Sequence, residues 1–281
     1  MNTKQQPMKH ASLFSGIGGF DLAAEWMGWD NVFHCEWEEV PRKILNYYWP
    51  NAISYGDITK TDFTVHRGHI DILTGGFPCQ DASSAMQYGK GQQGLQGSRT
   101  GLFYEMCRAI QEIKPKYVVA ENVSNILKTN GGEDFSTILS ELSAMGYNAE
   151  WRVCRASEVG APHHRARLYL VAYPDSFRLQ EGQTFFSNVQ ETSSQVEWIA
   201  NGASIQTFRG GRWAGEPPPL CLDDGFPGKI LGLSASRYRR ESIKGYGNAI
   251  VPQVALQIFK AINQYTKQTA GFASAVNMEE L

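Results

Sequence analysis

The sequence has little that would place the chain among disulfide-stapled, metal-binding or membrane proteins. Its five cysteines are odd in number and form no C-x-x-C pair, which argues against a disulfide scaffold and a structural zinc site. No stretch approaches the ~18 apolar residues that a membrane span needs. The polar N-terminal stretch MNTKQQPMKH lacks the apolar core of a signal peptide. We therefore expect a cytoplasmic protein that binds no metal and no membrane.

An excess of charge of one sign is also missing. The chain has 26 Lys and Arg against 28 Asp and Glu, so its total charge does not indicate a strongly basic nucleic-acid-binding protein. Residues 1–150 contain 12 basic and 17 acidic side chains, whereas residues 151–281 contain 14 and 11. These counts show only a modest shift of positive charge toward the C-terminal half. The basic side chains of that half include Arg209, Arg212, Arg237, Arg239, Arg240 and Lys244.

The order of hydrophobic patterns predicts an α/β fold. Strand-like runs alternate with segments of helical apolar spacing, which is typical of βαβ units and of a mostly parallel sheet covered on both faces. The expected strands are 10–14, 32–37, 70–77, 116–123, 149–156 and 167–173. The expected helices are 20–29, 41–49, 100–113, 135–147 and 247–265.

The pattern changes after residue 173. Residues 174–220 are rich in Ser, Gln, Asn, Gly and Thr and keep no long apolar period, which predicts either a small irregular lobe or a loop-dominated insertion. The apolar spacing returns in 247–265, which we expect to pack back on the first lobe.

A glycine cluster, SGIGG at 15–19, stands between the first strand and the first helix. Glycines at such a turn let the backbone approach a ligand, and the helix N-terminus offers unpaired N–H groups. Glu36 ends the next strand, where a carboxylate can accept hydrogen bonds from ribose hydroxyls. Asp57, at the end of a third strand, is a candidate for an adenine amino group. These residues predict a nucleotide-containing cofactor, and they do not distinguish a dinucleotide from S-adenosylmethionine.

The string GGFPCQDAS at 75–83 displays a cysteine on a loop shaped by glycine and proline, at the carboxyl end of a strand. Open α/β sheets place their chemistry at that edge. Cys79 is therefore a candidate nucleophile, because a helix N-terminus or an arginine nearby would stabilise its thiolate. Cys35, Cys107 and Cys154 are expected to be buried and inert.

Two further groups follow strands on the same edge. Glu121 comes just after an apolar run and is either a general acid or a structural cap. Arg165 and Arg167 are two positions apart, so in a strand they point to one face. They suit carboxylate, phosphate or carbonyl partners, or else form a surface pair. The adjacent His163 and His164 are expected to hydrogen-bond rather than to bind metal.

Taken together, these strings resemble the DNA (cytosine-5) methyltransferase family, in the family's order along nearly the whole chain. FSGIGGF resembles the cofactor loop, CEWE and GDI the ribose and adenine contacts, and GGFPCQDAS the nucleophile motif. ENV resembles the catalytic glutamate motif and HHRARLYLVAY the arginine strand, with His163 in place of the family's usual glutamine. DDGFPG and GNAIVPQVALQI are similar to the closing motifs.

The resemblance implies a Rossmann-like, doubly wound class I methyltransferase fold with a small inserted target-recognition lobe. A discontinuous catalytic domain, residues 1–173 and 246–281, would bind S-adenosylmethionine, and residues 174–245 would read DNA. The implied catalytic residues are Cys79, Glu121, Arg165 and Arg167. The implied cofactor contacts are Phe14, Gly16, Gly18, Gly19, Glu36, Trp37, Asp57, Ile58, Pro78, Leu102 and Asn248.

The implied reaction is methyl transfer to carbon 5 of a flipped-out cytosine in double-stranded DNA, through a covalent adduct with Cys79. The implied protein is a monomer of a bacterial or phage-infected cell, with a cognate restriction endonuclease as a candidate partner. The alternatives are a tRNA cytosine-5 methyltransferase, although its Cys-Phe-Thr tripeptide is missing, and a catalytically inactive DNA-binding relative. A nicotinamide-linked oxidoreductase would leave the Cys79 loop unexplained.

Overall fold

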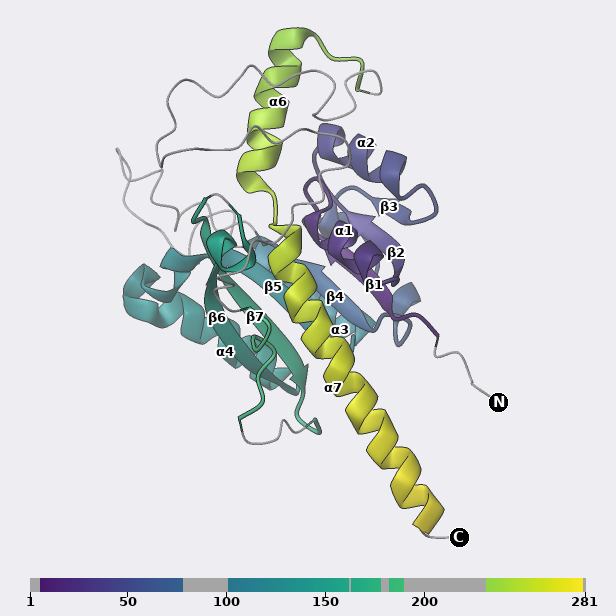
Figure 1. Cartoon of the computed structure of the whole chain (residues 1–281). Helices are drawn as coiled ribbons and strands as arrows, with labels where there is room; N and C mark the ends of the chain where they lie inside the picture. The colour runs from purple at the N-terminus through teal and green to yellow at the C-terminus, as the bar shows by residue number, and fades with distance from the viewer. Residues whose placement is uncertain (1–5, 78–100, 162, 178–181, 190–230, 280–281) are drawn as a thin grey trace.

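The described part of the chain forms a seven-stranded sheet in the order β3-β2-β1-β4-β5-β7-β6. The computed structural model describes residues 6–77, 101–161, 163–177, 182–189 and 231–279. Figure 1 shows the twisted sheet at the centre of the molecule. Its strands are β1 (Lys9–Leu13), β2 (Asp30–Cys35), β3 (Ile53–Tyr55), β4 (Ile72–Gly75), β5 (Tyr117–Val123), β6 (Tyr147–Arg155) and β7 (Ala166–Pro174).

The strand pairing puts the topological switch point of the sheet between β1 and β4. β1 pairs in parallel with β2 on one side and with β4 on the other, and β4 pairs in parallel with β5. The chain therefore winds outward in two directions from β1, and ligands of such sheets bind beyond the carboxyl ends at this switch point. β7 is antiparallel to both β5 and β6. The prediction of a doubly wound, mostly parallel sheet is confirmed.

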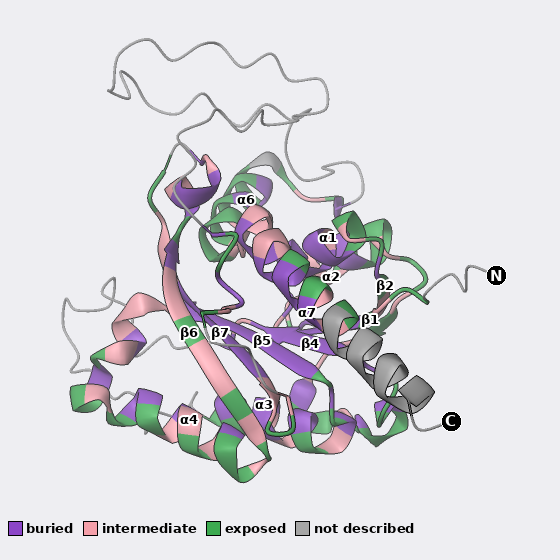
Figure 2. Ribbon diagram, turned by 60° about the horizontal axis from the view of Figure 1, so that its bottom comes forward, coloured by how far each residue is buried: buried purple, intermediate pink, exposed green. Residues whose placement is uncertain are grey.

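Helices cover both faces of the sheet (Figures 1 and 2). On one face, Phe20 and Ala23 of α1 pack with Phe259 of α7 against Ile72 and Val119. On the other face, α3 and α4 bury their apolar sides against inner residues of β1, β4 and β5. The helices are α1 (Gly19–Trp26), α2 (Glu39–Tyr48), α3 (Gly101–Ile113), α4 (Glu133–Ala144), α6 (Ala235–Asn248) and α7 (Pro252–Glu279).

The prediction of one continuous helix over residues 247–265 is wrong at its N-terminal end. Its first two residues end α6, residues 249–251 are a non-helical connection, and α7 begins at Pro252. A proline disfavours helical backbone in the residue before it and is well tolerated in the first helical turn, so Pro252 separates the two helices. None of the helices within the described ranges is long and apolar enough to cross a membrane.

Part of the predicted recognition region packs on the sheet. Phe185, Phe186 and Val189 lie in the apolar cluster formed by α1, α7 and the sheet. Glu150 of β6 accepts hydrogen bonds from the hydroxyl of Thr184 and the N–H of Phe185. The expected boundary after residue 245 falls inside α6. Residues 182–189 are therefore anchored to the first lobe, and the division of function at 174–245 stays a prediction.

Replacing Gly18 with alanine should destabilise the fold, because Gly18 has φ +87° and its added Cβ would lie 2.4 Å from the Trp49 ring. We expect a loss of about 3 kcal/mol in the free energy of unfolding, from overpacking and a left-handed backbone combined. Urea unfolding measures it. Gly101→Ala is the matched control, since nothing lies within 4 Å of its added Cβ. Equal midpoints for both variants would contradict the steric argument.

Candidate functional site

The turn that joins β1 to α1 has an unusual backbone. Phe14 has φ +51°, and Gly16 and Gly18 have φ +54° and +87°. A left-handed conformation costs a residue with a Cβ about 1–3 kcal/mol, and such strain clusters at ligand-binding positions. A hydrogen bond stabilises the turn: the Ser15 hydroxyl donates to the Ser12 carbonyl oxygen at 3.1 Å. The predicted cofactor turn is thus a strained, well-anchored segment beside the switch point of the sheet.

Glu36 lies directly against this turn. It follows β2 and is 9% exposed, and its Oε2 accepts the Gly16 N–H at 2.7 Å while its Oε1 accepts the Glu38 N–H at 2.8 Å. Burial raises the pKa of the Glu36 carboxyl, and the two N–H donors oppose that rise. Each oxygen keeps a further lone pair for another donor. Glu36 is therefore placed to bind a hydroxyl group at the mouth of the glycine turn.

Asp57 and Ile58 lie at the end of β3. Asp57 caps the short 3-10 turn Ile58–Lys60, and its Oδ1 accepts from both the N–H and the hydroxyl of Thr59. Those hydrogen bonds lower the pKa of Asp57. The Ile58 side chain is buried in the core. Arg108 of α3 donates to the Ile58 carbonyl oxygen at 2.6 Å, so a residue that the sequence analysis missed fixes this turn.

Asp21 is a second missed residue, and it lies under the glycine turn. It belongs to the first turn of α1, is 1% exposed, and accepts a hydrogen bond from the Ser12 hydroxyl at 2.9 Å on Oδ1. Its Oδ2 is buried and has no partner within the described ranges. Burial raises the pKa of Asp21 to about 7, and the bond from Ser12 opposes the rise. Asp21 could have been suspected from its place in GGFD, directly after the glycine cluster.

Glu121 and Arg167 form the central ion pair at the carboxyl end of β5. The Nε atom of Arg167 lies 3.1 Å from Oε1 of Glu121, and both side chains are largely buried. Burial raises the pKa of Glu121 to about 7, although Arg167 and Arg165 favour the charged form. Such a carboxyl is protonated in a sizeable fraction of molecules at neutral pH, and it can therefore act as a general acid.

The expectation that Arg165 and Arg167 share one strand face is wrong. β7 begins at Ala166, so Arg165 precedes the strand, and its φ of +22° lies outside strand geometry. Arg165 turns instead to the C-terminal end of α6, where its two terminal nitrogens donate to the carbonyl oxygens of Gly247 and Ala249 at 2.7 Å each. Only Arg167 reaches Glu121 with a direct ion pair.

Pro78 and Cys79 lie outside the described residues, but the strand that leads to them is placed. Gly76 and Phe77 follow β4, and a Cβ on Gly76 would lie 3.5 Å from Oε2 of Glu121. The amide of Asn122 donates to the Phe77 carbonyl oxygen at 3.3 Å. The chain therefore leaves β4 toward the predicted nucleophile at the position of the Glu121–Arg167 pair.

The remaining predicted residues lie around this edge. Trp37 is 69% exposed beside Glu36, Leu102 lies half-buried in the first turn of α3, and Asn248 is the exposed last residue of α6. Gly19 begins α1. Cys35, Cys107 and Cys154 are buried, as predicted. Burial raises their pKa values to about 12, which disfavours the reactive thiolate.

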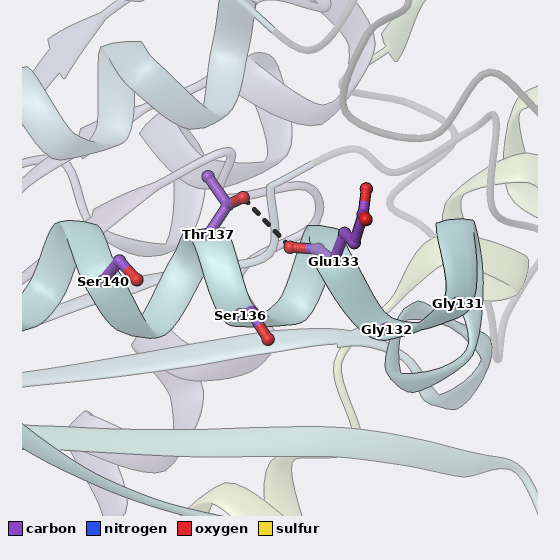
Figure 3. A pocket seen from close by; sticks show the side chains of 6 residues that line it. All are labelled: Gly131, Gly132, Glu133, Ser136, Thr137 and Ser140. Carbon is purple, nitrogen blue, oxygen red and sulfur yellow. Dashed lines mark hydrogen bonds between the residues drawn. The ribbon is translucent and has the colours of Figure 1, made fainter.

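A separate open depression lies at the start of α4, away from these side chains (Figure 3). In it the Thr137 hydroxyl donates to the Glu133 carbonyl oxygen at 3.0 Å. Its lining is formed by glycines, hydroxyl groups and Glu133 alone. No buried titratable group lies among these residues, so the depression offers no chemistry comparable with the edge at β1, β4 and β5.

A comparison with known proteins finds a protein family whose model matches this chain. The model of the C-5 cytosine-specific DNA methylase family matches residues 8–208. The type II methyltransferase M.Sau3AI of Staphylococcus aureus is 37% identical over 180 residues, covering 59% of this chain and 43% of its own. M.HhaI of Haemophilus parahaemolyticus is 31% identical over 200 residues, covering 68% and 59%. The chain thus spans about half the length of these relatives.

A solved structure shares the fold. A prophage-encoded protein of Escherichia coli, described as a DNA modification methyltransferase, superposes with a TM-score of 0.64 at 17% identity, covering 92% of this chain and 99% of its own.

The burial of Asp21 predicts how the free energy of unfolding depends on pH. Its pKa rises from 3.8 to about 7 on folding, so between these values the folded chain holds a proton that the unfolded chain has lost. This contribution to stability is complete below pH 3.8 and is lost by about 1.4 kcal/mol per pH unit as pH rises toward 7. Asparagine cannot ionise, so Asp21→Asn should flatten the pH dependence.

Urea unfolding between pH 5 and pH 8 measures the effect. Asp30→Asn, at an exposed position of β2, is the control and should leave the pH dependence of the wild type in place. Parallel stability curves for Asp21→Asn and the wild type would show that the Asp21 carboxyl is not responsible.

Proposed function

Because the chain belongs to the C-5 cytosine-specific DNA methylase family, we propose that it transfers a methyl group from S-adenosylmethionine to carbon 5 of cytosine in double-stranded DNA. The observation that carries the proposal is the buried Glu121–Arg167 pair. It lies at the same sheet edge as the glycine turn and the end of β4, from which the chain continues to Cys79. One edge therefore holds a carboxyl group, a cation and the glycine turn, together with Gly76 and Phe77, from which the chain continues to Cys79.

The described residues fit S-adenosylmethionine. The strained turn of Phe14, Gly16 and Gly18 lets a ligand approach the backbone, and Glu36 has free lone pairs for the ribose hydroxyls. Trp37 offers an exposed ring beside it. When bound, S-adenosylmethionine supplies an electrophilic methyl group on a sulfonium. We assign the further contacts to Gly19, Asp57, Ile58, Pro78, Leu102 and Asn248.

Cytosine needs activation before it can accept a methyl group, because its carbon 5 is a weak nucleophile. We assign this activation to Cys79, whose thiolate adds to carbon 6 and makes a covalent bond. The electron pair of the former 5,6 double bond then becomes available at carbon 5. Carbon 5 would bond to the methyl group as the methyl–sulfur bond breaks, and the sulfur would keep the electron pair of that broken bond and leave as S-adenosylhomocysteine. Loss of the carbon-5 proton and of the Cys79 thiolate restores the aromatic ring and the free enzyme.

Glu121 assists this addition by holding a proton at ring nitrogen 3. A proton there draws electrons from carbon 6, and a carboxyl with a pKa of about 7 can supply it near neutral pH. Arg167 holds the carboxyl of Glu121 in place and is suited to the base oxygen. The target base must leave the duplex to reach these groups, at a cost of a few kcal/mol that pocket binding has to offset.

DNA would be read by residues 174–245 of this chain. Arg237, Arg239 and Arg240 are exposed on α6, above the sheet edge that holds the proposed catalytic groups (Figure 1). Exposed guanidinium groups suit phosphate oxygens. From the resemblance to restriction-modification enzymes we also propose a cytoplasmic monomer with a cognate restriction endonuclease as its cellular partner.

The nucleophile is tested by Cys79→Ser in the full chain. Serine lacks a comparable anion at neutral pH, so methyl transfer should fall below detection while DNA binding stays within about twofold. Bisulfite sequencing of DNA from a methylation-deficient host that expresses each variant measures the transfer and reveals the target sequence. Cys221→Ser, at a cysteine outside the nucleophile motif, should methylate as the wild type does. Methylation of tRNA alone would overturn the proposed substrate.

Salt tests the proposed DNA surface. Counterion release makes the logarithm of the association constant fall linearly with the logarithm of salt concentration, by about 0.9 for each phosphate contact. The double variant Arg237→Gln/Arg239→Gln should therefore reduce the slope by about 1.8, as measured by fluorescence anisotropy of a labelled duplex. Lys116→Gln, just before the amino end of β5, is the control. An unchanged slope in the double variant would remove α6 from the DNA surface.

A further inference from the structure

The connection between α6 and α7 is fastened to the catalytic edge by one side chain. Both terminal nitrogens of Arg165 donate to backbone carbonyl oxygens, those of Gly247 and Ala249, at 2.7 Å and across 82 and 84 positions of sequence. Its Nε is buried and has no partner among the residues that the structure describes. Each terminal nitrogen of Arg165 therefore uses one of its two N–H groups on this connection, whereas Arg167 directs its Nε to Glu121.

Ile250, the next residue of this connection, is wedged between two parts of the site. A Cβ on Gly19 would lie 2.7 Å from the Ile250 carbonyl oxygen and 2.8 Å from its Cβ. A Cβ on Gly76 would lie 3.5 Å from Cδ1 of Ile250. Ile250 thus occupies the space beside the start of α1, where the glycine turn ends, and beside the residue that follows β4.

A second interaction, an ion pair, connects the C-terminal part of α6 to the segment that carries Glu36. Lys244 of α6 lies 2.6 Å from both carboxylate oxygens of Glu38, and the Glu38 N–H donates to Glu36 at 2.8 Å. Tyr238 of α6 packs with Val40 and Ile44 of α2 in a small apolar cluster. The last turns of α6 are therefore held both to the cofactor side and, through Arg165, to the start of β7.

The backbone of Arg165 shows that this arrangement is constrained. Its φ of +22° is unusual for a residue with a side chain, and such a conformation persists only where the surroundings enforce it. Hydrogen bonds from a charged donor are the strongest available to a carbonyl oxygen. The two hydrogen bonds from Arg165 can therefore hold the three-residue connection, residues 249–251, between α6 and α7.

We propose that Arg165 is a positioning residue that acts through Ile250. By holding the connection, it places Ile250 next to Gly19 and Gly76 and so sets the spacing between the glycine turn and the residue that follows β4. This inference rests on the proposed function, because it assigns to Arg165 the organisation of the cofactor turn and to Arg167 the contact with the base. The proposed role of Arg165 can therefore be tested by measuring ligand binding to the cofactor site in the absence of DNA.

The experiment measures binding of S-adenosylhomocysteine to the full chain by calorimetry, without DNA. Arg165→Met should weaken binding about tenfold, the effect of roughly 1.4 kcal/mol, because the turn loses its spacing. Arg165→Lys, which keeps the charge and can reach one carbonyl oxygen, should be intermediate. Arg155→Met, at the exposed arginine that ends β6, should bind as the wild type does. An arginine that only contacts the base would leave this affinity unchanged, and that result would overturn the proposal.

Hydrogen exchange of the ligand-free protein separates this proposal from the proposed function. Arg165→Met and Ile250→Ala should each raise the exchange rates of the amides of residues 16–20 at least fivefold and leave those of α4 unchanged. Equal rates in the wild type and both variants would overturn the positioning role. Faster exchange throughout the chain would also overturn it, because it would indicate general unfolding. Failure of the wild type to bind S-adenosylhomocysteine, with the local exchange effect present, would overturn the proposed function alone.

Discussion

The parallel pairing of β1 with β4 is the constraint on which the rest of the site depends. The register ends with Leu13 beside Gly75, so both strands stop at the same level and their following residues, Phe14 and Gly76, emerge side by side. The glycine turn follows one strand and the cysteine loop follows the other. Because β5 pairs with β4 in the same direction, Glu121 joins them at this edge. A slip of one residue in this register would move the glycine turn away from the Glu121 carboxyl.

Three buried polar side chains are tolerated here because they have hydrogen-bond partners or favour their neutral form. His10 bonds to Asn31 and Thr74 within the sheet, and burial lowers its pKa to about 4, so it is neutral. Asp21 and Glu121 respond to burial in the opposite direction. For Asp21 the raised pKa costs stability at high pH and has no stated chemical use. For Glu121 the same desolvation provides a proton at the place where the proposed reaction needs one.

Local patterns were a sound guide where the local sequence dominates. The strands and helices from β1 to β7 follow from hydrophobic period and turn residues, and the burial of Cys107 follows from its place on the apolar side of α3. α6 was missed because its sequence ASRYRRESIKGYGN is mostly polar, so it shows little apolar period. The strand-face prediction for Arg165 failed because alternation holds only within a strand, and Arg165 lies one residue before β7.

The sequence by itself determined the order of the elements, the residue types at the carboxyl ends of the strands, and hence the family. The tertiary structure alone decided which of these residues meet. Arg165 bonds to carbonyl groups more than 80 positions away, and Ile250 fills space that two glycines leave open. Neither contact has a period or a motif, since a backbone carbonyl is the same at every residue. Such contacts arise only when packing brings distant segments within hydrogen-bond reach.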